Sequence, residues 1–215
     1  MSVKRQYRAP HRERQAKATR ECITSAARRL FAHQGYAATT IDAISREAGV
    51  AIQTIYSNFG SKRAIVLALL DIMEQEGGVE QLQADLAAAA GDPALQIRHW
   101  VAFTRRFFER GADLLELAQA SMPMEPDVAA QWQEGERRRR EGARALVRSW
   151  EAVGALRSGL DATMASDIVW ALLGPELFRL LMIDSGWSGE QYENWLVGEL
   201  VGLLRTERQA KSVRQ

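Results

Sequence analysis

The chain has little of the chemistry on which most enzymes and disulfide-bonded proteins depend. Cys22 is the only cysteine among its 215 residues, so the chain cannot form an internal disulfide. A cysteine-rich metal site is excluded for the same reason. There are only three histidines, and no HExxH helix, GxSxG turn or glycine-rich phosphate loop is present. These absences predict a protein that is not an enzyme and that holds no cofactor and no metal.

Long hydrophobic runs are lacking as well. Pro175, Glu176 and Arg179 interrupt the longest apolar stretches, which stay below the roughly 18 residues that a membrane-spanning helix needs. The basic start of the sequence has no apolar segment of the kind found in signal peptides. We therefore expect no membrane partner and a cytoplasmic location, where the single thiol stays reduced.

The formal net charge is only +1, but the charges are unevenly distributed. Twelve Lys and Arg residues up to residue 63 stand against four Asp and Glu residues, which gives +8 for this part and leaves −7 for the remainder. A basic module on an acidic body is typical of a protein that binds a polyanion through one small domain.

Helical periodicity runs through the whole chain, and no segment alternates with the period of a strand, so the predicted fold is all-α with about nine helices. Residues 1–16 are expected to form a flexible basic arm, because they carry almost nothing to bury. The expected helices cover residues 17–35, 39–48, 51–57, 61–76, 92 onward, 112–120, 126–153, 161–186 and 188–204, with a weaker segment at 79–90. The expected N-terminal caps are Thr39 with Asp42, Ser61, and Ser188 with Gln191. Ile52, Ile55 and Phe59 are expected in the core.

Two short helices joined at Gly49-Val50 and preceded by a longer one indicate a helix-turn-helix, whose last helix enters the major groove of DNA. Gln53 and Thr54 fall in the first turn of that last helix, where Gln can pair with adenine and the Thr methyl can meet thymine. Lys62 beside a helix start and the phenol of Tyr56 suit phosphate contacts. The alternative is that Gln53 and Thr54 are merely solvated and that Tyr56 packs.

The segment TTIDAISREAGVAIQTIYSNFGSKRAIV resembles the DNA-binding signature of the TetR family of bacterial regulators. The stretches ALRSGLD, GPELFRLL and SGWSGEQYENWL resemble the last helices of an actinobacterial-type subgroup. The resemblance implies a homodimer with a DNA-binding domain at 17–77 (helix-turn-helix at about 39–59, a connector helix from 61) and an effector-binding and dimerisation domain at 78–215. The implied DNA-contacting residues are Thr39, Thr40, Gln53, Thr54, Tyr56, Ser57, Asn58 and Lys62.

This sequence departs from the family pattern at two places. Ala51 stands where the family usually has a serine that caps the third helix, and Ser57-Asn58 replaces the common Tyr-His before Phe59. We therefore expect fewer phosphate contacts from this helix and expect the basic arm to compensate by entering the minor groove.

Aromatic residues at helical spacing in the C-terminal part indicate either a dry core or a pocket for a small hydrophobic or aromatic effector. The candidate ligand-binding residues are Met73, His99, Trp100, Phe103, Thr104, Phe107, Trp132 and Trp170. The arginines at 137–140 alternate with glutamates at helical spacing, which favours a solvated, ion-paired face over an anion site. Apolar faces on the last two helices predict a homodimer interface at Leu177, Leu181, Trp195, Leu196, Leu200, Leu203 and Leu204.

The predicted function is a DNA-binding transcriptional regulator on a palindromic double-stranded operator. The resemblance favours a repressor that a small molecule releases, although no residue separates a repressor from an activator. The alternatives are a helical hydrolase, which would show a nucleophile and a base close together in the C-terminal part, and an adaptor that binds only protein, which would leave the basic module unexplained.

Overall fold

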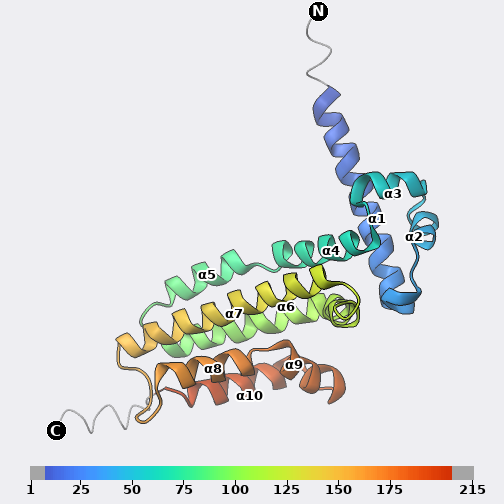
Figure 1. The fold of residues 1–215 in the computed structure, drawn as a ribbon. Helices are drawn as coiled ribbons and strands as arrows, with labels where there is room; N and C mark the ends of the chain where they lie inside the picture. Colours follow the sequence, from blue (N-terminus) through green and yellow to red (C-terminus); the bar gives the residue numbers. More distant parts are fainter. Residues whose placement is uncertain (1–7, 205–215) are drawn as a thin grey trace, which may run out of the picture. The chain divides into compact units, whose positions relative to one another are not determined.

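The computed structural model describes residues 8–204 and confirms the predicted all-α class (Figure 1). The helices are α1 (Arg8–Ala38), α2 (Ile41–Ala48), α3 (Ile52–Phe59), α4 (Lys62–Glu76), α5 (Val79–Ala88), α6 (Pro93–Ser121), α7 (Pro126–Ala152), α8 (Ala162–Leu172), α9 (Pro175–Phe178), the π-helical η1 (Arg179–Asp184) and α10 (Gly189–Val201). Within this range there is no strand, only one antiparallel bridge between Leu156 and Leu204. None of the described helices combines the length and apolarity that a membrane span requires.

The chain divides into two compact units. The first contains the residues up to Met73 together with Asp113–Gln131, and the second contains Glu74–Ala112 and the residues from Trp132 onward. The first division therefore falls at 73/74, where the sequence suggested 77/78. The corner between α6 and α7 joins the first unit, which the sequence did not indicate.

Helix α1 is longer than predicted, because it begins at Arg8. Residues 8–16, expected in the flexible arm, are helical; Arg12, Arg14, Gln15 and Ala16 have high helix propensity and are exposed, so they extend the helix without adding to the core. Residues 1–7 of the predicted arm lie outside the described residues. Further along, Ile23, Ala26, Ala27 and Phe31 bury one face of α1, and Gly35 kinks it with φ 78°, a left-handed conformation that glycine adopts without strain.

The ends of the helices that follow α1 are defined by their capping residues. The Thr40 side chain accepts a hydrogen bond from the Ala43 N–H at 3.1 Å and so caps α2, whereas the sequence had suggested Thr39. Gly49, with φ 65° and ψ 29°, ends α2 in the left-handed region. Ala51 precedes α3 without any side-chain cap, as its methyl group requires, and Ser61 caps α4 through the Ala64 N–H, as predicted.

Lys62 holds the start of α4 against the end of α1. Its Nζ donates to the carbonyl oxygens of Tyr36 at 2.8 Å and Thr39 at 2.9 Å, and it lies 4.0 Å above the Tyr36 ring. The Tyr36 hydroxyl in turn donates to Glu125 Oε1 at 2.5 Å. Burial lowers the pKa of the Lys62 ammonium, although the nearby negative charge of Glu125 acts in the opposite direction. The pKa of the Tyr36 hydroxyl is raised, mainly by burial and also by its hydrogen bond to Glu125.

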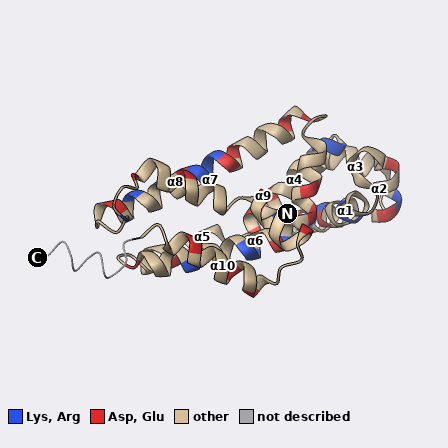
Figure 2. Ribbon diagram, turned by 90° about the horizontal axis from the view of Figure 1, so that it is seen from below, with Lys and Arg blue, Asp and Glu red and all other residues tan. Residues whose placement is uncertain are grey.

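Polar contacts also attach the α6–α7 corner to the first unit. Arg28 donates to both carboxylate oxygens of Asp113, at 2.6 and 2.7 Å, and this bidentate pair is half-buried. Arg63 pairs with Asp127 at 3.1 Å on the surface. Exposed pairs such as Arg46–Asp42 place both charges on α2 (Figure 2), so part of the positive charge of this unit is neutralised locally.

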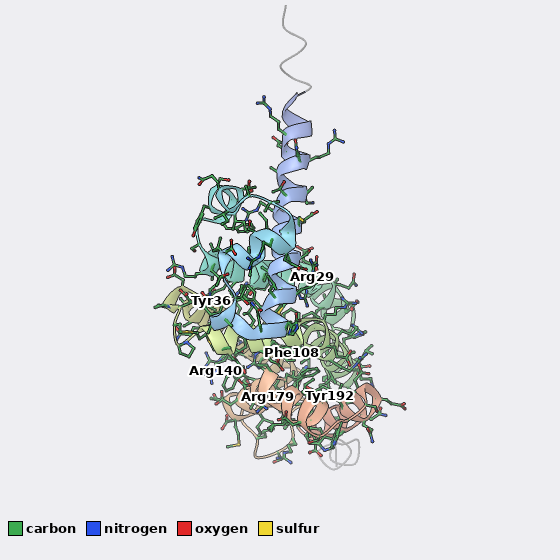
Figure 3. All side chains as sticks on the ribbon, turned by 90° about the vertical axis from the view of Figure 1, so that its right-hand side faces the viewer. Arg29, Tyr36, Phe108, Arg140, Arg179 and Tyr192 are labelled. Carbon is green, nitrogen blue, oxygen red and sulfur yellow. The ribbon has the colours of Figure 1, made fainter. Side chains whose placement is uncertain are left out.

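The second unit is a helical bundle whose neighbouring helices are joined by side-chain contacts. Gln96 of α6 accepts from the buried Trp150 indole of α7 at 2.8 Å and donates to the Leu86 carbonyl at the end of α5. The rings of Phe108, Phe178 and Tyr192, from α6, α9 and α10, follow one another with centroids 5.5 and 5.8 Å apart, the first pair tilted and the second edge to face. Figure 3 labels Phe108 and Tyr192, the first and last of the three. In Figure 1, α8 and α10 lie below α6 and α7.

Two predicted helix boundaries are wrong in this part. The short helix expected at 112–120 is the continuation of α6, which runs unbroken to Ser121 because the prolines at 123 and 126 come only after it. The helix expected at 161–186 is broken instead, since Pro175 lacks the N–H that would continue α8 and starts α9 after Gly174. The capping box predicted at Ser188 and Gln191 is confirmed at the start of α10.

We expect Lys62→Met to lower the free energy of unfolding by about 1–3 kcal/mol, because two half-buried carbonyl oxygens lose their donor. The urea midpoint measures this change. Arg63→Met is the matched control: its ion pair with Asp127 is exposed, so the expected change stays within about 0.5 kcal/mol. A Lys62→Met protein as stable as the Arg63→Met protein would contradict the contacts described above.

Candidate nucleic-acid interface

The exposed face of α3 carries the side chains best placed to meet DNA. Gln53 is exposed in the first turn and Tyr56 is 48% exposed one turn on, while Ile55 is fully buried against the rest of the unit. Thr54 is half-buried, and Thr40 is exposed at the cap of α2. This pattern leaves four of the predicted residues available for contact with bases and phosphates.

Backbone groups at the start of α3 are available too. No side chain caps this helix, so its first N–H groups remain open to an acceptor such as a phosphate oxygen. The loss of the capping serine therefore removes one phosphate-contacting hydroxyl but leaves the donors that it would have satisfied.

Ser57 and Asn58 are partly engaged within their own helix. The Ser57 hydroxyl donates to the Thr54 carbonyl oxygen at 3.0 Å, which uses its only proton, and Asn58 Nδ2 donates to the same oxygen at 2.7 Å. Asn58 also lies beneath Arg20, which donates to its carbonyl oxygen and covers the Phe59 ring at 4.1 Å. In this conformation the remaining amide proton of Asn58 is the side-chain donor that the two residues can offer to a phosphate, while their side-chain oxygens can still accept from bases.

Two predicted contact residues face inward. Thr39 is 1% exposed, and its hydroxyl donates to the Gly35 carbonyl oxygen at 2.8 Å, so its prediction as a DNA contact is wrong. The Lys62 ammonium faces the Tyr36 and Thr39 carbonyl oxygens and is not presented as an isolated charge. We therefore expect a structural role for Lys62 in place of the predicted phosphate contact, because residue type and spacing do not show which acceptors a long side chain reaches.

One exposed residue of this face was assigned to the core by its sequence pattern. Ile52 is 41% exposed at the first position of α3, although it shares helical spacing with the buried Ile55. An apolar side chain there suits a thymine methyl group. Periodicity could not identify it, because an eight-residue helix offers too few turns to define its buried face.

The predicted ligand-binding residues do not gather in one place. Trp100 and Thr104 are buried, and Phe103 and Phe107 stack on each other at 5.6 Å, which is the core alternative weighed above. His99 is half-buried on the same helix, and Met73 belongs to the first unit. Of the eight predicted residues, Trp132 and Trp170 line a pocket of about 590 Å³ in the second unit.

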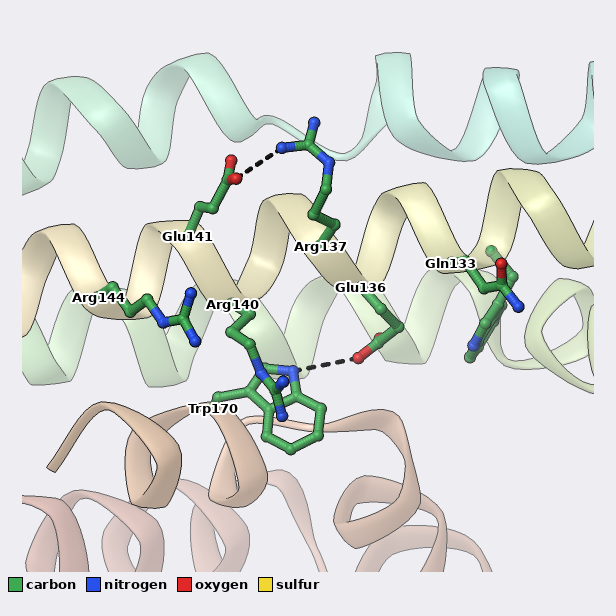
Figure 4. Close-up of a pocket in the computed structure, with 8 residues that line it drawn as sticks. Gln133, Glu136, Arg137, Arg140, Glu141, Arg144 and Trp170 are labelled. Atoms are coloured by element: carbon green, nitrogen blue, oxygen red, sulfur yellow. Dashed lines mark hydrogen bonds and ion pairs between the residues drawn. The ribbon is translucent and has the colours of Figure 1, made fainter. Parts of the chain in front are cut away.

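That pocket has a volume of about 590 Å³ and lies between α7 and α8 (Figure 4). Its polar lining was not predicted as a binding site and consists of Gln133, Glu136, Arg137, Arg140, Glu141 and Arg144. The Trp170 indole N–H donates to Glu136 at 3.2 Å, and the Arg140 guanidinium lies over its ring (Figure 4). No group of three or more metal-ligating side chains occurs among the described residues.

The predicted dimer residues fall into two groups. Leu196, Leu200 and Leu203 are buried within the chain's own core, so their assignment to an interface is wrong: α10 turns this face toward its own bundle. Leu177, Leu181, Trp195 and Leu204 remain partly exposed. Large apolar side chains that a second copy could cover are found instead at Met164, Leu180 and Ile183.

Comparison with known proteins connects this arrangement to a family. The chain is similar to the HTH-type transcriptional repressor NicS of Pseudomonas putida, with 29% identity over 157 residues that cover 73% of this chain and 68% of that protein. It is also similar to the HTH-type transcriptional regulator HbdR of Aromatoleum sp., with 48% identity over 61 residues, or 26% of this chain and 27% of that one.

A solved structure shares the fold over most of the chain. A protein from Saccharomonospora viridis, described as a transcriptional regulator in complex with choline, superposes with a TM-score of 0.71 at 19% identity and covers 88% of this chain and 100% of its own. Residues 23–69, from α1 into α4, match the family model described as bacterial regulatory proteins of the tetR family. Residues 23–69 therefore form a DNA-binding domain of the tetR type, and the chain is a DNA-binding transcriptional regulator.

Proposed function

We propose that this regulator acts in the cytoplasm as a homodimer on a palindromic operator, that it represses the genes beside it, and that a small molecule bound in the second unit releases it. The observation that carries the proposal is the exposed face of α3, on which Gln53, Tyr56 and Ile52 are all exposed while Ile55 is buried. Repression is supported by the similarity to NicS, which is named as a repressor. We further propose that the chain itself performs no catalysis.

Two-fold pairing is supported by apolar side chains that the single chain leaves open. Leu180 and Ile183 on η1 are 48% and 51% exposed, and the half-buried Trp195 and Trp187 lie edge to face at 5.7 Å nearby in sequence. A symmetric pair would cover such residues and would repeat the recognition helix at a spacing of about one DNA turn, roughly 34–36 Å.

Ligand release is supported by the way helices cross between the units. Helices α4, α6 and α7 each have residues in both units, so a displacement of α7 beside its pocket can be carried along the helix to the corner at Asp113–Gln131. Such a ligand changes operator affinity only as far as it prefers one arrangement of the helices, and the operator must change ligand affinity by the same factor.

Gln53→Ala should relax the preference for one or two base pairs at a cost of about 1–3 kcal/mol, because an exposed bidentate donor and acceptor is lost. Genome-wide mapping of bound sites would first supply the operator, and titration against single-base variants then measures the change. Gln83→Ala, at an exposed position of α5, is the control and should leave every affinity unchanged. If the Gln53→Ala protein and the wild type show the same relative affinities for the single-base variants, the proposal that α3 recognises bases through Gln53 is rejected.

The dimer is tested by the molar mass in light scattering at micromolar concentration. We expect twice the 24.0 kDa of one chain, and we expect Leu180→Asp with Ile183→Asp to reduce it toward one chain, because charges would be buried in the interface. Val153→Asp, at a residue that is 63% exposed elsewhere, should leave the mass unchanged. A monomeric wild-type protein would overturn this part of the proposal.

A further inference from the structure

The run of four arginines on α7 contains one member that differs from its neighbours. Three of them are ion-paired, as the sequence predicted for the whole run: Arg137 bonds to Glu134 and Glu141, Arg138 to Glu74, and Arg139 to Glu136. In Figure 2 this part of α7 shows basic and acidic segments next to one another. Arg140 forms no ion pair with any carboxylate of the described residues.

Arg140 is held by an aromatic ring and lacks an acceptor. Its guanidinium lies 3.9 Å from the centroid of the Trp170 ring, and its Nε is buried without a hydrogen-bond partner among the described residues. Buried donors are almost always satisfied, so an unsatisfied one needs an explanation. Stacking on an indole leaves the in-plane N–H groups of a guanidinium free to bind an anion in bidentate geometry.

The surroundings of Arg140 are those of a ligand pocket with excess positive charge. Arg144 lines the same pocket one turn further along α7 and is exposed (Figure 4). The two lining glutamates are already engaged, Glu136 by Arg139 and Glu141 by Arg137. Arg140 and Arg144 are therefore the charges without a counter-charge at this site.

We propose that the pocket between α7 and α8 binds a planar aromatic carboxylate, with the carboxylate on Arg140 and Arg144 and the ring against the indole of Trp132. This inference rests on the proposed function, because it names the chemical class of the effector. The volume of about 590 Å³ is in the usual range for a small-molecule site, and two tryptophans with a few polar groups match the usual composition of such a site.

The same geometry disfavours the other classes of ligand. A quaternary ammonium such as choline, which the Saccharomonospora viridis protein binds, would stack on a tryptophan face, but Arg140 already occupies the face of Trp170 and would repel it. A neutral apolar molecule would leave the buried Arg140 donor unsatisfied and add desolvation to its cost. Only an anion satisfies the donor and balances the charge.

Isothermal titration of the full chain without DNA tests the inference, with benzoate, 2-naphthoate and indole-3-carboxylate as probes. We expect saturable binding of at least one acid, and we expect its amide to bind at least about tenfold more weakly, since a charge-assisted pair is lost. Arg140→Gln should weaken the acid about ten- to a hundredfold and leave the amide unchanged. Arg138→Gln is the matched control on the same helix, outside the pocket, and should bind like the wild type.

The exposed Arg144→Gln protein provides a second variant whose folding is not at risk, and it should also weaken the acid selectively. The inference is overturned if none of the three acids binds below about 1 mM, if acid and amide bind equally, or if choline binds more tightly than the acids. It is also overturned if Arg140→Gln converts a dimer into monomers, because the pocket would then belong to the subunit interface.

Operator titrations separate this inference from the proposed function. If a small molecule releases the protein from its operator and still does so in the Arg140→Gln variant, the proposed function is supported and the aromatic carboxylate site is rejected. Acid binding that depends on Arg140 but leaves operator affinity unchanged would support the site and contradict ligand release through it.

Discussion

The DNA-reading part of this protein depends on the Lys62 ammonium, which is withdrawn from water and bonded to two carbonyl oxygens at the end of α1. The Tyr36 oxygen also accepts from the Thr39 N–H at 3.3 Å, and the first residue of α4 supplies a further donor to both oxygens at the kinked end of α1. Tyr36 extends the arrangement, because its ring lies beneath the ammonium and its hydroxyl binds Glu125. Lys62 and Tyr36 thus connect α1, α4 and the α6–α7 corner. We infer that the orientation of α3, which lies between α2 and α4 in the chain, depends on these contacts.

This arrangement assigns separate tasks to the two units. In the first, Lys62 is bonded within the protein, so we expect contact with DNA from the exposed face of α3, the cap at Thr40 and the open N–H groups of α3. In the second, the pocket beside Arg140 lies on α7, whose first residues belong to the first unit. Continuity of that helix provides a physical route by which occupancy of the pocket could change operator affinity.

Much of the fold follows from the sequence because its signals are local. Gly49 ends α2, Ser61 caps α4, and Ser188 with Gln191 starts α10, all through contacts within a few residues. What the sequence did not show depends mostly on partners far apart in the chain. Lys62 matches the chemistry of a phosphate contact, yet its two acceptors lie at the end of α1, 26 and 23 residues away. The α10 leucines could serve a core or an interface, and only the packed bundle decides. Arg140 has the same sequence pattern as its paired neighbours, and only the position of Trp170 distinguishes it.

The role of Lys62 is the central claim, and the salt dependence of operator binding tests it directly. A lysine that contacts phosphate contributes about 0.9 to the slope of log affinity against log salt concentration, whereas a lysine that acts inside the protein contributes nothing. The account predicts that Lys62→Met lowers affinity together with stability and leaves the slope of the wild type unchanged. A slope smaller by about one, in a variant as stable as the wild type, would contradict the account.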